Sequence, residues 1–430
     1  MNDTDLKSRI GPAIVSRSEH NISRANISSN ALKVLYRLRG AGFDAFLVGG
    51  GVRDLLLGKH PKDFDVVTNA DPDQIKDLFR NCRLIGRRFR LAHVRFGRDI
   101  VEVATFRASA AGLEDDERAH SDSGRILRDN VYGSIDEDVW RRDFTVNALY
   151  YNIADFSIWD YVSGFEDVKA RTLRLIGDPE TRYHEDPVRM LRAVRFAAKL
   201  GFEIAPETAA PIGVLGRLLA DVPSARLFDE LLKLFHSGYA QRSFDLLVQY
   251  DLLRYLFRDT SDLLATPLKE TMLKFIRQGL ANTDERVRSD KSVTPMFLYA
   301  VMLWFPIKEL AERLRQEGWH DSQALMEASQ RIVAAQQTAF PRRFSAPMKE
   351  LLTMQWRFSQ RRGARAARLL QHKRFRAAYD FLLLRAECGE VDRETVDWWT
   401  ELQTASPAEQ AQPETRVLHV HVHSRRNPEM

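Results

Sequence analysis

The sequence contains very little cysteine. Cys82 and Cys388 are the only two cysteines in 430 residues, and they form no CxxC pair. Two isolated thiols exclude a disulfide framework and a cysteine-based zinc site, and they are typical of proteins from a reducing compartment. The chain also lacks an apolar run of about 18 residues, and its first residues lack the apolar stretch of a secretory signal. We therefore predict no membrane segment and a cytoplasmic location.

The numbers of positive and negative side chains are also nearly balanced. The chain has 64 Lys and Arg against 59 Asp and Glu, for a net charge of +5, although the pI is about 9.1. This balance permits a polyanionic partner without requiring one. Hydrophobic residues make up 44% of the chain, which is enough for a large core in more than one domain. A disordered or fibrous protein is therefore excluded.

The pattern of short apolar runs changes along the chain. Between Phe43 and Tyr151, helical stretches alternate with the β-rich runs AFLVGG, DFDVVT, RLIG, HVRFG and IVEVATF. This alternation predicts an α+β domain, a head with a small mixed β-sheet and helices. Asp71-Pro72 predicts a helix start. After Gly164, long amphipathic patterns predict an all-helical remainder.

These changes divide the chain into five predicted segments. Residues 108–125 have almost no large apolar side chains and predict a mobile loop within the head. The segments are an N-terminal extension (1–30), the head (31–160), a helical neck (161–260), a helical body with a C-terminal region (261–404) and a flexible tail (405–430).

The most distinctive local pattern is the glycine turn Gly49-Gly50-Gly51. The turn follows the apolar run AFLV and precedes the helical stretch VRDLLLG. Glycines let backbone N–H groups approach an anion without a Cβ in the way, so the turn predicts a cradle for a triphosphate. A simple tight turn is the alternative interpretation.

Two carboxylates follow in the next predicted strand. Because alternate residues of a strand share a face, Asp63 and Asp65 project together while Phe64 and Val66 turn toward the core. Adjacent carboxylates repel unless cations lie between them, and a pair of Mg²⁺ ions is their natural ligand. A strand end with solvated charges is the alternative.

A third carboxylate has two candidates. Glu102 is the only charge in the apolar run Ile100–Ala104, and Asp143 follows two arginines in RRDFTVNAL. Arg142 and its neighbour are suited to hold triphosphate oxygens, while Asp143 orients them or supports the metals. An Arg–Asp salt bridge at a domain junction is the alternative for this second motif.

A further motif is EDPVRMLRAVRF, in which Pro187 predicts a helix start. Asp186 and Arg189 then lie one turn apart on the same face. An acceptor and a planar donor fork in this arrangement can hydrogen-bond the edge of a nucleobase. An ordinary surface ion pair is the alternative.

In this order and spacing, GGGVRDLLLG, DFDV, RRDFTVNALYYN and EDPVRMLRAVRF resemble the class II family of polymerase-beta-type nucleotidyltransferases. That family contains bacterial poly(A) polymerases and the enzymes that add CCA to tRNA. The resemblance covers at least residues 43–201. The segment 84–96 looks like the part that marks the poly(A) polymerase branch, and a weaker similarity continues to HKRFRAAYDFLLLRAE.

The resemblance implies template-independent addition of AMP from ATP to RNA 3′ ends, in RNA processing and decay, with Mg²⁺ as the cofactor. It implies that Asp63 and Asp65 hold the metals, that Asp143 is catalytic, and that Asp186 and Arg189 select the base. The residues that would face the nucleotide are Gly49, Gly50, Arg53, Arg142 and Asn147. RNA-decay proteins are implied as partners. Two alternatives are a CCA-adding enzyme on the same scaffold and an RNA-binding adaptor with an inactive head.

The stretch 341–376 is strongly basic. It holds eleven Lys or Arg against the single acid Glu350, and it includes Trp356, Phe358 and Phe375. Cations for phosphates and rings for stacking predict an RNA track. The arginines whose spacings of three and four would place them on one helical face are Arg361, Arg362, Arg365 and Arg368. A solvated basic helix face is the alternative.

Overall fold

The structure is a computed structural model that describes residues 11–86, 90–108, 131–361, 363–406 and 410. Most of the loop predicted over 108–125, nearly all of the tail predicted over 405–430, Arg362 and part of the segment 84–96 lie outside the described residues.

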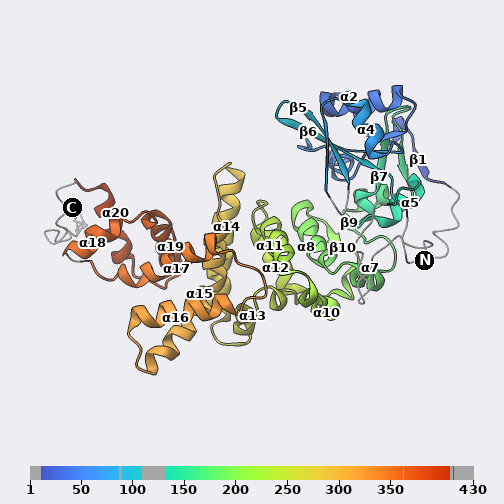
Figure 1. Cartoon of the computed structure of the whole chain (residues 1–430). Coiled ribbons are helices and arrows are strands. Elements are labelled where there is room, and N and C mark those ends of the chain that lie inside the picture. Colours follow the sequence, from blue (N-terminus) through green and yellow to red (C-terminus); the bar gives the residue numbers. More distant parts are fainter. Residues whose placement is uncertain (1–10, 87–89, 109–130, 362, 407–409, 411–430) are drawn as a thin grey trace, which may run out of the picture. The chain divides into compact units, whose positions relative to one another are not determined.

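The described residues form two compact units. The first comprises the residues up to Pro223 together with Leu246–Leu252, and the second comprises Ser224–Asp245 together with the residues from Leu253 onward. Figure 1 shows that the strands lie in the first unit, whereas the second unit is built from helices. The finer division into five segments stays a prediction.

An eight-stranded mixed sheet organises the first unit. Its strand order is β1-β8-β7-β2-β3-β6-β5-β4. Strand β2 is antiparallel to both β3 and β7, whereas β3 and β6 are parallel. The strands are β1 (Ala13–Val15), β2 (Ala45–Val48), β3 (Asp65–Thr68), β4 (Cys82–Ile85), β5 (Leu91–Phe96), β6 (Asp99–Thr105), β7 (Leu149–Asn152) and β8 (Ile158–Asp160). The mixed sheet predicted for the head is confirmed, and β1 adds to it residues from the predicted N-terminal extension.

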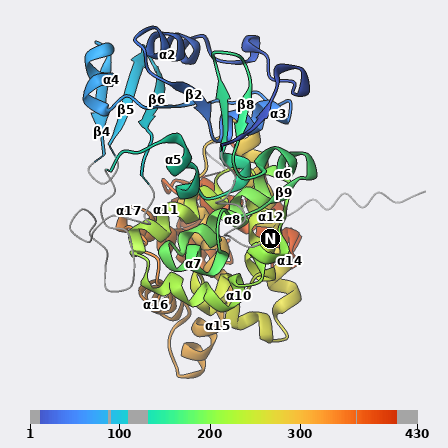
Figure 2. The same ribbon diagram turned by 90° about the vertical axis from the view of Figure 1, so that its right-hand side faces the viewer.

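Helices cover both sides of this sheet. Figure 2 shows α2 (Ser29–Gly40) along one side and α5 (Ile135–Arg141) along the other. The stripe that α2 buries has the helical spacing of three and four and consists of Ala31, Val34, Leu35 and Leu38. Helix α4 (Pro72–Leu78) begins as predicted, because Asp71 accepts hydrogen bonds from the backbone N–H groups of Asp73 and Gln74.

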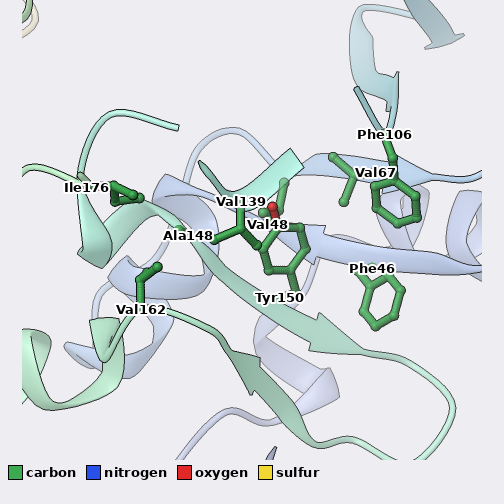
Figure 3. Close-up of a cluster of buried hydrophobic side chains, with 9 residues drawn as sticks. All are labelled: Phe46, Val48, Val67, Phe106, Val139, Ala148, Tyr150, Val162 and Ile176. Carbon is green, nitrogen blue, oxygen red and sulfur yellow. The ribbon is translucent and has the colours of Figure 1, made fainter. Parts of the chain in front are cut away.

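A cluster of buried side chains lies between α5 and the sheet. Phe46 and Val48 of β2 share a face with Tyr150 of β7, and Val139 of α5 packs against this face (Figure 3). The ring of Phe46 lies 5.0 Å from that of Trp159 on β8, measured between centroids. Because β2 has all four of its residues buried, it fixes the position of the chain immediately after it, the glycine turn.

The part of the first unit that follows the head is mostly helical. Its helices are α6 (Gly164–Ala170), α7 (Pro179–Glu185), α8 (Val188–Leu200), α9 (Pro206–Ala209) and α10 (Ile212–Leu215). The prediction of an all-helical remainder is wrong in one detail, since β9 (Thr172–Leu173) pairs in parallel with β10 (Glu203–Ile204). Leu173 and Ile204 are buried, so these stretches need each other's backbone groups as hydrogen-bond partners.

The second unit is helical in all its described elements, and α12 runs from it into the first unit. Its helices are α11 (Ser224–Phe235), α12 (Ala240–Gln249), α13 (Arg258–Asp262), α14 (Lys269–Arg288), α15 (Pro295–Gln316), α16 (Asp321–Ala334), α17 (Arg342–Arg357), α18 (Gly363–Leu370), α19 (Phe375–Glu387) and α20 (Arg393–Thr404). Phe381 of α19 packs edge-on against Phe275 of α14 and Trp304 of α15.

The basic stretch contributes to this core and not only to the surface. Phe358 and Phe375 are buried, and their rings lie 5.1 and 5.7 Å from that of Trp399. The prediction that these two rings stack on RNA is therefore wrong, because helix packing already covers them. Arg361 precedes α18 and pairs with Glu394, so it does not share a helical face with Arg365 and Arg368.

Together the two units confirm the α+β fold class. None of the helices described here is both long and apolar enough to cross a membrane.

Candidate active site

The glycine turn joins β2 to α3 (Gly50–Leu56). Gly49 caps this helix with a φ of 75°, a region that residues with a Cβ rarely adopt. A Cβ built on Gly49 would lie 3.6 Å from Oδ2 of Asp65, and one on Gly50 would lie 3.3 Å from Nη2 of Arg53. The turn thus runs directly beside a carboxylate of the predicted metal site.

The three candidate metal-binding carboxylates line one cavity next to this turn, together with a fourth, Asp99. Asp63 precedes β3, Asp65 begins it, and Glu102 lies opposite Asp65 in the register of the parallel β3–β6 pair. All three line a cavity of about 460 Å³. As predicted from strand alternation, Phe64 and Val66 are buried while the two aspartates stay accessible. Glu102 is further approached by His93, whose Nε2 lies 3.3 Å from Oε1.

Burial and neighbouring negative charge act together on Asp65. Although the residue has an exposed surface, its carboxyl group is partly buried, and this burial together with Glu102 and Asp63 raises the pKa of Asp65 to about 6, against an opposing effect of Arg142. Among the described residues, no hydrogen bond or ion pair engages this carboxylate. A divalent cation would offset the repulsion, so the residues fit a bound Mg²⁺.

The third metal ligand is not assembled in this structure. Within the described part of the chain, no group of three or more His, Cys, Asp or Glu side chains is placed to hold one ion. Glu102 shares the cavity with the two aspartates, whereas the carboxylate of Asp143 is already engaged. Its Oδ2 accepts hydrogen bonds from Nε and Nη2 of Arg192, the first at 2.8 Å.

Asp143 is the centre of a hydrogen-bonded chain. Its Oδ1 accepts from Asn147 Nδ2 at 3.2 Å, and Asn147 Oδ1 in turn accepts from Nη1 of Arg53. Burial alone would raise the pKa of Asp143, but Arg192 and the other hydrogen-bond donors hold it below its usual value. The chain therefore links α8, which carries Arg192, to the glycine turn beside Arg53.

Arg53 supports the glycine turn from inside the protein. The residue is 2% exposed, and its Nε and Nη2 donate to Asp54 at 2.9 and 2.7 Å. The expectation that Arg53 faces the triphosphate does not match this placement, because its guanidinium is already enclosed by Asp54, Asn147 and the turn.

Arg142 is held by the carboxylate of Asp138, a residue not predicted from the sequence as part of the site. Its Nε and Nη2 donate to Asp138 at 3.1 and 2.8 Å, and its Nε also donates to the hydroxyl of Tyr150 at 2.7 Å. Burial would lower the pKa of Arg142, but Tyr150 and Asp138 outweigh it and raise the pKa. The spacing of four residues between Asp138 and Arg142 was the available signal. Arg142 stays charged and acts on Asp65 electrostatically.

The predicted base-selecting pair is organised differently from expectation. Arg189 donates through Nη1 to Oε2 of Glu185 at 2.8 Å and to the carbonyl oxygen of Arg182 at 2.7 Å. Asp186 directly follows α7 and accepts a hydrogen bond from the backbone N–H of Val188 at 3.3 Å. Glu185, adjacent to Asp186 in the motif, thus holds the guanidinium together with the carbonyl oxygen of Arg182.

Arg182 connects this pair to the arginine motif. Its Nη1 donates to Glu185 at 2.6 Å, and its Nη2 donates to the carbonyl oxygens of Arg141 and Arg142 at 3.1 and 2.7 Å. Burial and the neighbouring Arg189 lower the pKa of Arg182 to about 10. The structure thus gathers the predicted site residues into one unit, and their chemical roles stay predictions.

The raised pKa of Asp65 has a consequence for stability. A carboxyl group with a raised pKa is disfavoured when ionised, so its destabilising effect is complete above about pH 6 and fades as the pH falls toward the unfolded value. Asp65→Asn is expected to raise the melting temperature of the metal-free protein at pH 8 by roughly 2–4 °C, with a smaller gain at pH 5. Thermal melts in a chelator between pH 5 and 8 measure this, and a gain that does not depend on pH would contradict it.

Comparison with known families extends from the head to the C-terminus. Residues 45–174 match the family described as "Poly A polymerase head domain". Residues 201–264 match "Probable RNA and SrmB- binding site of polymerase A", and residues 317–429 match "Polymerase A arginine-rich C-terminus".

Individual proteins give the same result. The chain is 52% identical over 405 residues to a protein of Escherichia coli O6:H1 named "Poly(A) polymerase I", covering 92% of this chain and 87% of that one. A "CCA-adding enzyme" of Lactobacillus helveticus is more distant, at 32% identity over 70% of each chain. The solved structure "tRNA-processing enzyme (apo form I)" shares the fold, with a TM-score of 0.61, 23% identity and coverage of 90% of this chain and 94% of that one.

The order of these similarities confirms the resemblance found in the sequence motifs. With half of its residues identical to a poly(A) polymerase across nearly its whole length, the chain belongs to the bacterial poly(A) polymerases of the class II polymerase-beta-type nucleotidyltransferase family.

Proposed function

We propose that this enzyme adds AMP from ATP to the 3′ ends of RNA without a template and releases pyrophosphate. The observation that carries the proposal is the cavity in which Asp63, Asp65 and Glu102 meet beside the glycine turn, in a chain of the poly(A) polymerase family. The RNA 3′ hydroxyl attacks the α-phosphorus of ATP, and the bond to the pyrophosphate breaks.

The chain's own residues hold the reactants. Asp63 and Asp65 are the proposed ligands of Mg²⁺, which when bound would lower the pKa of the attacking hydroxyl and neutralise the leaving pyrophosphate. Gly49 lies beside Asp65, and the backbone N–H groups of Gly49 and Gly50 are the proposed cradle for phosphate oxygens. Arg142 supplies positive charge next to Asp65, while Asp143, Asn147 and Arg53 keep the turn in place.

A single experiment tests the function. RNA is incubated with Mg²⁺ and each of the four nucleoside triphosphates separately, and extension and pyrophosphate release are both measured. Extension with ATP alone supports the proposal. Efficient incorporation with CTP would identify a CCA-adding enzyme, and folded protein that binds RNA without releasing pyrophosphate would identify an adaptor. The RNA-decay partners implied by the resemblance stay a prediction.

Selection of the base is the next prediction. Because Glu185 and the carbonyl oxygen of Arg182 fix Arg189, its donor fork is held in one orientation, which suits recognition of one base. Arg189→Ala is expected to reduce discrimination against CTP and GTP by about 10- to 100-fold, with a smaller change in the KM for ATP.

Two further variants complete this test. Arg189→Lys keeps the charge but loses the planar fork, so it should also lose discrimination. Arg217→Ala removes an arginine with an exposed side chain from the same unit and is the matched control. Unchanged preference among the four nucleotides in Arg189→Ala would show that Arg189 has only a structural role.

A further inference from the structure

The second unit contains a cavity that the proposed reaction does not use. Its volume is about 360 Å³, and it lies between the C-terminal end of α14, the start of α15 and one side of α19. Figure 1 shows these helices next to one another. One turn before the cavity, a Cβ on Gly279 would lie 2.8 Å from Val301 and 3.0 Å from Leu384. The helices thus pack in close contact at Gly279 and leave space beyond it.

The lining brings three cations and three carboxylates together; Asp380 is partly buried, whereas Glu285 and Glu387 are exposed. Arg286, Lys291 and Arg376 line the cavity, and Nε of Arg376 lies 3.0 Å from Oδ1 of Asp380. Burial raises the pKa of Asp380, although Arg376 and Arg286 oppose the shift. Arg286 donates to the carbonyl oxygen of Ser292 at 3.2 and 3.0 Å, which holds the loop between α14 and α15 against the cavity.

His236 adds a buried polar atom without a partner. Its Nε2 is enclosed and makes no hydrogen bond within the described residues, and His236 is one of the residues that line the cavity. Burial lowers the pKa of His236 to about 4, so the ring is neutral near pH 7. A buried ring nitrogen without a partner is unfavourable, and a ligand gains affinity by hydrogen-bonding it once the ring has turned to bring Nε2 to the cavity surface.

Apolar side chains form another part of the cavity lining. Met296, Phe297 and Leu384 line the same cavity, so an aromatic ring can be covered there while charged groups stay near the cations. The volume is at the lower end of the range for small-molecule sites, which is about 300–1,000 Å³. A planar heterocycle with one phosphate group has this size and this combination of surfaces.

We propose that this cavity binds one nucleotide, with its base against Phe297 and the neighbouring apolar side chains and its phosphate near Arg286 and Lys291. His236 and Asp380 then hydrogen-bond the base or the ribose. The nucleotide is either free or one residue of a bound single-stranded RNA, and this second source depends on the function proposed above. The site belongs to the second unit alone, since every residue that lines it comes from that unit.

The test fills the cavity by substitution and measures whether a photoreactive nucleotide still labels the protein there. Ala377 on α19 lines the cavity, so Ala377→Trp places an indole into it. Ala364→Trp, at an exposed position on α18, is the matched control. The full-length parent and both variants are labelled with 8-azido-AMP, and the labelled peptides are mapped by mass spectrometry. The affinity for AMP is measured in parallel, and thermal melts show whether each variant folds. Lys291→Ala, a loop substitution, is the second variant should Ala377→Trp fail to fold.

In the parent, label is expected on peptides from α14, α15 or α19. Ala377→Trp should lose this label and weaken AMP binding at the site by about tenfold or more, whereas Ala364→Trp should keep both. Lys291→Ala should weaken AMP binding while the protein stays folded. Protection of the label by oligo(A) identifies a residue of RNA as the occupant, and protection by AMP but not by oligo(A) identifies a free nucleotide.

Absence of label from these three helices in the parent, or equal labelling of the parent and Ala377→Trp, would overturn the proposal. Addition of AMP to RNA is measured on the same samples. Labelling of the cavity without any addition of AMP to RNA would support this binding site and rule out the proposed function. Addition of AMP to RNA without labelling of the cavity would support the proposed function and rule out this binding site.

Discussion

Replacing Asp65 with Ala is expected to lower the rate of AMP addition by about 10³- to 10⁵-fold, while the affinity for RNA stays within about twofold. The substitution removes the carboxylate that lies beside Gly49 and opposite Glu102, at the point where negative charge is most crowded. Because that crowding destabilises the metal-free protein, the Ala variant should fold at least as well as the parent. Loss of activity would then reflect lost metal binding.

The control removes a carboxylate that lies outside the cavity. Asp77→Ala changes an exposed residue of α4 in the same unit and should leave the rate within about twofold of the parent. The measurements are single-turnover extension of a short RNA over a range of Mg²⁺ concentrations, and RNA binding in a chelator. A folded Asp65→Ala protein that extends RNA at a near-normal rate would rule out the two-metal assignment.

Replacing Arg192 with Ala is expected to destabilise the protein by about 3–5 kcal/mol and to lower its activity as well. The change leaves the buried carboxylate of Asp143 without its main cation and loosens the chain through Asn147 to Arg53. In the variant, burial raises the pKa of Asp143, so protonation relieves the destabilisation in acid. The loss of stability should therefore be largest near pH 7 and should shrink as the pH falls toward 4.

A double-mutant cycle separates the structural and chemical roles of this ion pair. The cycle compares Asp143→Asn, Arg192→Gln and the two combined; the double variant removes both charges and should recover much of the stability lost in Arg192→Gln. If Asp143 only positions the motif, the double variant regains activity with an unchanged Mg²⁺ dependence. If Asp143 is a metal ligand, stability returns without activity, and the Mg²⁺ requirement rises. Denaturant unfolding and extension at varied Mg²⁺ measure the two effects, and equal stability of Arg192→Ala and the parent would contradict the importance of the pair.

The local features of the active site could be predicted from the sequence because they depend on short-range geometry. Alternation along a strand was enough to expose Asp63 and Asp65 and to bury Phe64 and Val66. The positive φ of Gly49 and the capping of α4 by Asp71 also follow from residue type and neighbours alone.

Mistaken expectations arose where a side chain had two plausible environments. Phe358 and Phe375 stand among arginines in the sequence, but they pack on Trp399 from another helix, which local spacing cannot reveal. Arg53 follows the glycine turn and was expected to face phosphate. Its guanidinium is buried and donates a hydrogen bond to Asn147, 94 residues away in the chain.

The sequence by itself determined the family and the α+β class and predicted which residues carry the chemistry, because four motifs in a fixed order depend only on residue identity and spacing. The tertiary structure alone decided which of these residues meet. The register of β3 and β6 places Glu102 opposite Asp65, and packing of α8 brings Arg192 to Asp143 across 49 residues. The physical reason is that such contacts depend on burial and on hydrogen-bond partners that distant segments supply, and these exist only once the chain has folded.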